Sequence, residues 1–205
     1  SVGGALLNVI HSQVTAIGGS GSDDDTTTIL RFLLRQASAP FFEILEHWIY
    51  EGRIDDPYDE FFIEEQTLVA RSDMMEVYDE SYWHRKFTVR EEMLPLFIAH
   101  MREQIFNAGK FLHVLRSCDM DVQSLLAKQR ATGAHKQAEP QLAPIEYMAH
   151  AREYTAGIES AYSAASKVLI EHVMGELQLK QRLMSLKRFF LLDQGDFLLH
   201  FMDVA

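Results

Sequence analysis

The chain has 205 residues, of which 47% are hydrophobic and 24% are charged, as in an ordinary globular protein. Its formal net charge of −11 argues against a nucleic-acid binder, which would need a basic face. The charge is uneven: residues 1–118 hold 10 basic and 19 acidic residues, whereas residues 119–205 hold 9 and 11. We therefore expect the first half to meet a basic surface rather than a membrane or a phosphate group.

Cysteine usage and hydropathy indicate the compartment. The single cysteine, Cys118, cannot form an internal disulfide bond, which fits a reducing compartment. No apolar run approaches the roughly 20 residues that a membrane span requires, and no signal pattern opens the chain. The chain begins at Ser1 without methionine, and apolar residues at helical spacing begin by Leu6. We expect it to be a piece of a longer protein.

Apolar residues at three- and four-residue steps predict two helices before residue 40. The apolar positions of the first helix are Leu6, Ile10, Val14 and Ile17. An acidic, glycine-rich loop at 18–25 follows, and Asp25 or Thr26 could cap the second helix. The apolar positions of that helix are Ile29, Leu30, Leu33, Leu34 and Ala37. We expect it to break before Pro40, because the residue before a proline disfavours helical backbone.

The segment 40–52 predicts the next helix. Its apolar positions are Phe41, Ile44, Leu45, Trp48 and Ile49. Pro40 stands near the first turn and Gly52 just past the last apolar residue, where each residue type is favoured. We expect Trp48 to lie in the core of this part of the chain.

A turn rich in aromatic rings follows this helix. Asp55, Asp56 and Pro57 favour a turn. The rings that come directly after it belong to Tyr58, Phe61 and Phe62. Such a dense aromatic run in a rigid segment indicates packing rather than a reaction centre. The only strand that the sequence indicates lies at 61–65.

The sequence 88–91 has the spacing of a capping box and predicts the start of a long helix, with a kink at Pro95. The apolar positions of this helix are Leu94, Phe97, Met101, Ile105, Ala108, Leu112 and Leu115. Residues 119–144 lack the helical spacing of apolar residues and are rich in glycine, proline, glutamine and alanine. We interpret them as a linker.

Helical rhythm returns in the last third of the chain. The apolar positions there are Ile145, Met148, Ile158, Tyr162, Ala165, Leu169 and Val173, then Leu179, Leu183, Leu186 and Phe190. The sequence 193–196 breaks the chain before a further helix, which starts at Phe197. The predicted fold is therefore all-α, an elongated stack of helical bundles in two parts.

Spacing tests for catalytic and metal sites are negative. None of the nine histidines has a glutamate three residues before it, as a di-iron bundle requires, and no H-E-x-x-H occurs. Glu43 and His47 would share a helix face, but one such pair is expected by chance. Gly109 and Lys110 lack the other residues of a phosphate loop. We expect no enzyme, no cofactor and no bound metal.

Three further clusters favour structural roles. A lone cysteine at a helix end, such as Cys118 near His113, is more often structural than catalytic. The acidic residues within 55–60 are better explained as turn formers than as paired carboxylates. The one basic cluster, which we interpret as a solvated helix face, comprises Lys180, Arg182, Lys187 and Arg188.

Several motifs together resemble the gamma-tubulin complex protein family, and most closely its component-two branch. The segments similar to the first conserved grip motif are 42–46, 48–50, 52, 54–58, 60–61, 82–83, 109–112 and 116–118. Those similar to the opening of the second grip motif are 164–169, 186–192 and 193–197. Phe111 replaces the tyrosine usual in the family. The structural positions that the motifs mark are Trp48, Asp56, Pro57, Tyr58, Phe61, Tyr82, Trp83, Gly109, Lys110, Gly195, Asp196 and Phe197.

The resemblance implies a scaffold. Residues 1–118 would be the later part of the first grip motif, a helical bundle for lateral contact. Residues 119–144 would be a linker, and residues 145–205 the truncated start of the second, gamma-tubulin-binding half. Family members pair side by side with a sister component, here of the component-three type, and each carries one gamma-tubulin. They assemble into a ring or spiral that nucleates microtubules.

The resemblance also implies a place in the cell and a role for residues 193–197. The location would be the cytoplasm and cytoskeleton, at a microtubule organizing centre such as a centrosome or spindle pole. Gly195 and Asp196 would form a corner that orients the helix from Phe197, with the main gamma-tubulin surface beyond Ala205. Two alternatives remain open: a helical metal-binding or enzymatic domain that uses scattered histidines and glutamates, and a generic helical-repeat adaptor.

Overall fold

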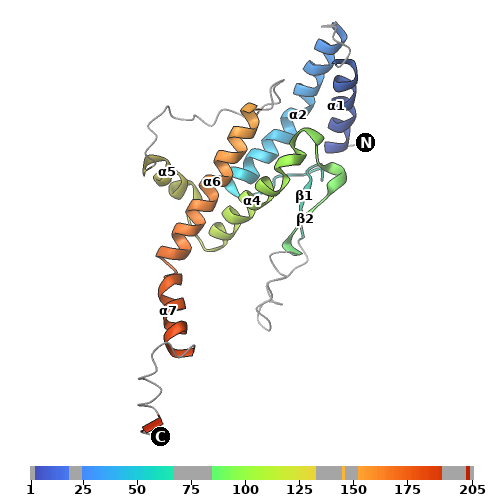
Figure 1. Cartoon of the computed structure of the whole chain (residues 1–205). Coiled ribbons are helices and arrows are strands. Elements are labelled where there is room, and N and C mark those ends of the chain that lie inside the picture. The colour runs from blue at the N-terminus through green and yellow to red at the C-terminus, as the bar shows by residue number, and fades with distance from the viewer. Residues whose placement is uncertain are drawn as a thin grey trace. The chain divides into compact units, whose positions relative to one another are not determined.

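The computed structural model describes residues 3–18, 25–66, 85–132, 145, 152–190 and 202–203. The chain divides into two compact units, Ser1–Ala165 and Ser166–Ala205. The described α-helices are α1 (Gly4–Gly18), α2 (Asp25–Glu51), α4 (Arg102–Ser117), α5 (Val122–Thr132), α6 (Arg152–Gly175) and α7 (Leu179–Phe190). The shorter elements are β1 (Ile63–Glu65), β2 (Phe87–Val89) and the 3₁₀ helices η2 (Glu91–Met93) and η3 (Leu96–Met101). Helices dominate (Figure 1), so the predicted all-α class is confirmed.

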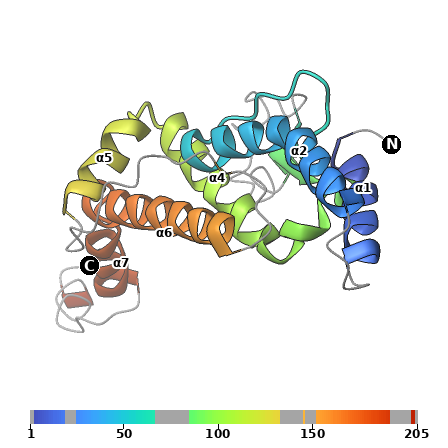
Figure 2. The ribbon, with the colours of Figure 1, turned by 90° about the horizontal axis from the view of Figure 1, so that it is seen from above.

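Helix α2 is the central element of the first unit, and α1 and α4 both pack against it (Figure 2). The predicted break before Pro40 is wrong, because α2 runs through the proline as one helix of 27 residues. A proline inside a helix costs about 3 kcal/mol. Buried side chains on both sides of it, Leu34 and Phe42 among them, each contribute roughly 1.5–3 kcal/mol and offset that cost.

The core of the first unit is built from aromatic rings. The rings of Phe41, Phe61 and Phe62 lie within ring-contact distance of one another, with centroids 4.7–6.2 Å apart. Phe42 contacts Tyr154, which α6 contributes from its first turn, at 6.2 Å. These contacts join α2, the turn after it and the beginning of α6 in a single hydrophobic core.

Trp48 lies in the core of the first unit, as the sequence predicts, with no exposed surface. Its indole Nε1 donates a hydrogen bond to the carbonyl oxygen of Ile105 in α4, at 2.9 Å. The ring lies against Gly109, where an added Cβ would be 1.9 Å from Trp48 Cε2. On another side, the centroid of the Phe87 ring is 4.9 Å away. Trp48 therefore fixes the distance between α2 and α4.

The strands correct the prediction for the middle of the chain. β1 pairs antiparallel with β2, with Ile63 opposite Val89 and Glu65 opposite Phe87. The predicted capping box at 88–91 is wrong, because Thr88 lies in β2 and the next α-helix begins only at Arg102. Pro95 has extended backbone (ψ 132°), as does the residue before it, and such geometry stops helix growth.

Helix α5 lies within the predicted linker. It occupies Val122–Thr132, within the range 119–144 that we interpreted as linker. Val122 and Leu126, one helical turn apart, are 6% and 4% exposed, so the helix is held by packing. The rest of that range, from 133 to 144, lies outside the described residues.

The contact between Trp48 and Gly109 gives the first prediction. Gly109→Ala should destabilise the protein by about 2 kcal/mol, because overpacking a core costs roughly 1–3 kcal/mol and a rigid indole cannot move aside. Urea unfolding measures this change.

The matched control is Gly157→Ala in α6, where the nearest atom to an added Cβ is 3.8 Å away. It should leave stability unchanged or raise it by up to about 1 kcal/mol, through better helix propensity. Equal effects of the two substitutions would contradict the tight packing of α2 on α4.

Candidate interaction site

The turn after α2 is organised by one carboxylate. Asp56 accepts hydrogen bonds from the backbone N–H groups of Glu60 (3.0 Å) and Phe61 (2.7 Å), one on each oxygen. Arg90, which follows β2, lies 3.8 Å from the same carboxylate and also donates to the carbonyl oxygen of Phe61. Both oxygens of Asp56 are thus used to hold the turn, which supports the structural interpretation of the acidic cluster.

The rings of this turn divide into two groups. Phe61 has no exposed surface and belongs to the core, whereas the ring of Tyr58 is 81% exposed. The expectation that Tyr58 packs inside is wrong, because the turn held by Asp56 directs it outward. Pro57 is also exposed. A large ring on a rigid, solvent-exposed turn is suited to contact with a partner protein.

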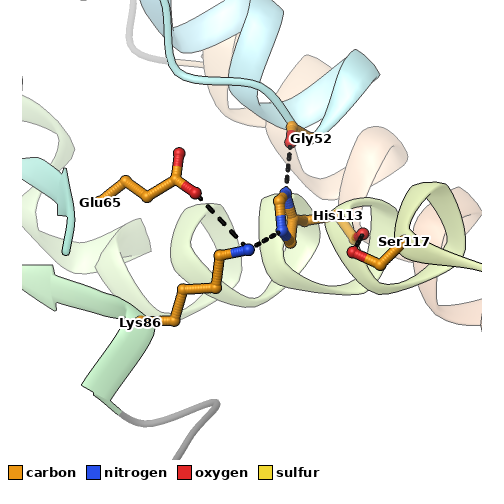
Figure 3. A network of polar contacts seen from close by, with 5 residues as sticks. All are labelled: Gly52, Glu65, Lys86, His113 and Ser117. Carbon is orange, nitrogen blue, oxygen red and sulfur yellow. Dashed lines mark hydrogen bonds and ion pairs between the residues drawn. The ribbon is translucent and has the colours of Figure 1, made fainter. Parts of the chain in front are cut away.

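A polar network connects the end of α2, the hairpin and α4 (Figure 3). Nδ1 of His113 is 3.3 Å from the carbonyl oxygen of Gly52, and its Nε2 is 2.6 Å from Nζ of Lys86. Nζ of Lys86 is in turn 3.5 Å from the carboxylate of Glu65. Because an ammonium group can only donate, Nε2 accepts and the imidazole is neutral, with its proton on Nδ1 facing Gly52.

Gly52 makes the close approach of α2 to α4 possible. Its φ is +64°, and an added Cβ would lie 2.5 Å from the backbone nitrogen of His113. Glycine is the residue that tolerates both the positive φ and the close contact. Burial lowers the pKa of His113 most, and the charge of Lys86 lowers it further. The contact with Gly52 and the charge of Glu65 oppose this lowering of the pKa, and Arg116 adds the smallest effect in the lowering direction.

The Gly109–Lys110 pair lies inside α4 and contributes to packing. Lys110 lies over the ring of Phe106, with Nζ 4.9 Å from the centroid, and burial lowers its pKa. Phe111, which departs from the family pattern, contacts Tyr162 of α6 at 6.1 Å. Cys118 is exposed at the end of α4. The other motif positions, Tyr82, Trp83, Gly195, Asp196 and Phe197, lie outside the described residues.

The roles of His113, Lys86 and Arg90 were missed from the sequence. His113 contacts residues that are 27 and 61 positions away in the sequence, and Arg90 donates a hydrogen bond to a residue 29 positions away. No local spacing encodes such distant pairs, so only the tertiary structure identifies them.

A cavity of about 120 Å³ opens between α1 and α2. Its lining residues are Gly3, Leu6, Leu7, Ala37, Pro40, Phe41, Ile44 and Glu60. Ile29 and Leu33, 58% and 49% exposed, continue this face of α2, since 29, 33, 37, 40 and 44 are three or four residues apart. We call the cavity together with Ile29 and Leu33 the α1–α2 groove.

Helix α7 in the second unit presents a second apolar surface. Leu179, Leu183 and Leu186 recur at four- and three-residue steps and are 38%, 54% and 49% exposed. We call these three residues the α7 face. The basic cluster Lys180, Arg182, Lys187 and Arg188 is exposed on the same helix, in agreement with the predicted solvated face. Residues 179–190 contain no acidic side chain.

The part of the chain that the structure describes has no grouping of metal-binding side chains and no helix suited to span a membrane. Within those ranges no three or more His, Cys, Asp or Glu side chains are grouped so that they could hold a metal ion. None of the described helices combines the length and the apolar character needed to cross a bilayer.

Comparison with known proteins defines the class. Residues 1–176 match the family "Gamma tubulin complex component N-terminal". The chain is 39% identical to mouse gamma-tubulin complex component 2, over all of this chain and 20% of that protein. It is 30% identical to the fission yeast spindle pole body component alp4 over 99% of this chain and 25% of that protein. It is 26% identical to human gamma-tubulin complex component 3, over 98% of this chain and 21% of that protein.

The chain therefore belongs to the gamma-tubulin complex component family. Relatives named component 2 are 29–39% identical to it, and those named component 3 are 26–27% identical, in agreement with the component-two resemblance. It spans about a fifth to a quarter of the length of these relatives. The family supports the expectation of a non-enzymatic protein. The division at 118 and 144 stays a prediction.

The neutral His113 gives the second prediction. Because its pKa is lowered in the fold, the unfolded chain binds a proton there at higher pH than the folded chain does. Its contribution to stability is complete above the unfolded pKa of about 6.5 and is lost as the pH falls through that value toward the lowered pKa. His113→Gln should make the free energy of unfolding less sensitive to pH between about 7.5 and about 5.5.

His100→Gln is the control, because His100 is exposed and lies in η3, away from the network. It should keep the pH dependence of the unmodified protein. Urea unfolding at both pH values measures the difference. If His113→Gln retained the full pH dependence, the network would not hold His113 neutral.

Proposed function

We propose that this chain is a scaffold segment of the gamma-tubulin complex, which pairs laterally with a sister component and helps to position gamma-tubulin for microtubule nucleation. The observation that carries the proposal is the family match over residues 1–176. With it goes the similarity of nearly all of this chain to about a fifth of the length of proteins named components of that complex. The name of the fission yeast relative supports a location at a microtubule organizing centre, in the cytoplasm and cytoskeleton.

The physical character of the first unit supports a role in protein contact. The tight packing of Trp48, the Asp56 turn and the His113 network give a rigid frame. On this frame Tyr58 is exposed between the acidic residues Asp55 and Asp59, both also exposed. Tyrosine is enriched in the centres of protein interfaces, and charges at the rim steer association.

The acidic balance of residues 1–118 favours a partner surface that is basic. The alternative of a metal-binding or enzymatic domain has no comparable support in the described ranges, where no metal-holding group of side chains was found. The family match favours the gamma-tubulin complex over a generic helical adaptor.

The third prediction tests the lateral contact. In the full-length protein, Tyr58→Ala should weaken binding to the sister component about fivefold to thirtyfold, the range typical of an interface tyrosine. Leu96→Ala is the matched control, because Leu96 is also an exposed hydrophobic residue, 61% exposed, but outside the Asp56 turn. Equilibrium binding of the purified proteins measures the effect.

The same experiment tests the charges. Association should slow when the ionic strength rises from about 50 mM to about 300 mM, because salt screens attraction between the acidic surface and a basic partner. An association rate that does not change with salt would mean that the acidic residues take no part. Retention of gamma-tubulin by the same complex tests the positioning role. A full-length protein that bound neither gamma-tubulin nor the sister component would refute the proposed function.

A further inference from the structure

Within the described part of the chain, the exposed ring of Tyr58 has no partner. No hydrogen bond, ion pair or ring contact among the described residues involves the side chains of Asp55, Tyr58 or Asp59, and all three are exposed. The turn that carries them is nevertheless held firmly, because each carboxylate oxygen of Asp56 accepts a backbone hydrogen bond. A fixed aromatic ring, with a carboxylate on either side of it in the sequence, therefore faces solvent.

The basic side chains near this turn do not neutralise the two exposed carboxylates. Arg53 lies 3.5 Å from the carboxylate of Glu51. Arg90 lies beside the carboxylate of Asp56 and donates to the carbonyl oxygen of Phe61. A protein surface that covers the ring must therefore supply a cation, because carboxylates that lose their hydration without gaining a partner oppose binding.

A guanidinium group fits this combination of ring and carboxylates better than other cations. Its flat face stacks on an aromatic ring, its N–H groups pair with carboxylate oxygens, and it is more weakly hydrated than an ammonium group. A lysine ammonium matches the charge but has neither the plane nor the fork. A metal ion fits poorly, because the described residues contain no group of three or more side chains that could hold one.

We propose that the Asp56 turn, residues 55–61, binds an arginine side chain of the sister component. The guanidinium group stacks on the ring of Tyr58 and pairs with the carboxylates of Asp55 and Asp59. Tyrosine and arginine are both enriched among the residues that dominate interface energies, and a ring held in place before binding loses little entropy. This inference rests on the proposed function for the identity of the partner, and it adds the chemistry of the contact.

The fourth prediction uses the full-length protein and two short peptides, in which glycine alternates with either arginine or lysine. The arginine peptide should bind about twofold to fivefold more tightly, the range of an exposed cation–π contact. Tyr58→Leu keeps an apolar side chain without a ring, so it should abolish this preference. Tyr58→Phe keeps the ring and should retain the preference. Isothermal titration at low salt measures the affinities.

Asp55→Asn and Asp59→Asn test the carboxylates at nearly unchanged shape. Residue 59 has a φ of +56°, a backbone conformation that asparagine also adopts. Each substitution should weaken the binding of both peptides about twofold, as expected for an exposed ion pair. Leu96→Ala, at an exposed hydrophobic residue outside the turn, is the control and should leave the preference for arginine unchanged. Urea unfolding checks that each variant is folded.

The second part of the test identifies the protein that supplies the arginine. Each exposed arginine of the sister component is changed to lysine, which keeps the charge. One of these changes should weaken the complex with the unmodified protein about twofold to fivefold. The same change should have no effect on the complex with Tyr58→Leu, because the two side chains then no longer interact.

Two results of the peptide experiment would overturn the proposal: equal binding of the two peptides, or a preference for arginine that survives Tyr58→Leu. A complex in which no arginine-to-lysine change depends on Tyr58 would overturn the assignment of the arginine to the sister component. A sister component that does not bind at all would instead refute the lateral pairing in the proposed function. The peptides would then still decide whether the turn binds arginine.

Discussion

The packing of Trp48 against Gly109 is the constraint on which the first unit depends. Because residue 109 has no side chain, the indole lies directly on the backbone of α4 and donates its N–H to Ile105. This contact sets the spacing of α2 and α4, and Phe87 brings the hairpin against the same ring. The second close approach, of Gly52 directly after the end of α2 to His113 in α4, lies farther along the chain. Two glycines thus fix one helix pair at two points.

The rigid helix pair explains why the turn after α2 can present a ring to solvent. Asp56 uses both carboxylate oxygens to hold the turn, and Arg90 attaches that turn to the segment after β2. Phe61 is thereby buried while Tyr58 is exposed. A side chain that is held in place before binding loses less entropy when a partner binds, which favours a role in protein contact.

The surfaces of the protein suit assembly more than catalysis. Its acidic first half, its exposed tyrosine and its two apolar surfaces are features of a protein that contacts other proteins. Membership of the gamma-tubulin complex component family agrees with this character.

The sequence by itself determined the helical class, most helix positions and the family, because helical periodicity and short motifs are local properties of the chain. The tertiary structure alone decided three further features. Helix α2 continues through Pro40 because core burial on both sides outweighs the local cost of proline. Residues 87–89 form a strand because β1, more than 20 residues earlier, pairs with them. His113 is neutral and half-buried because Gly52 and Lys86, distant in sequence, contact its ring. Each of these depends on free energy from contacts between distant residues, which no local pattern contains.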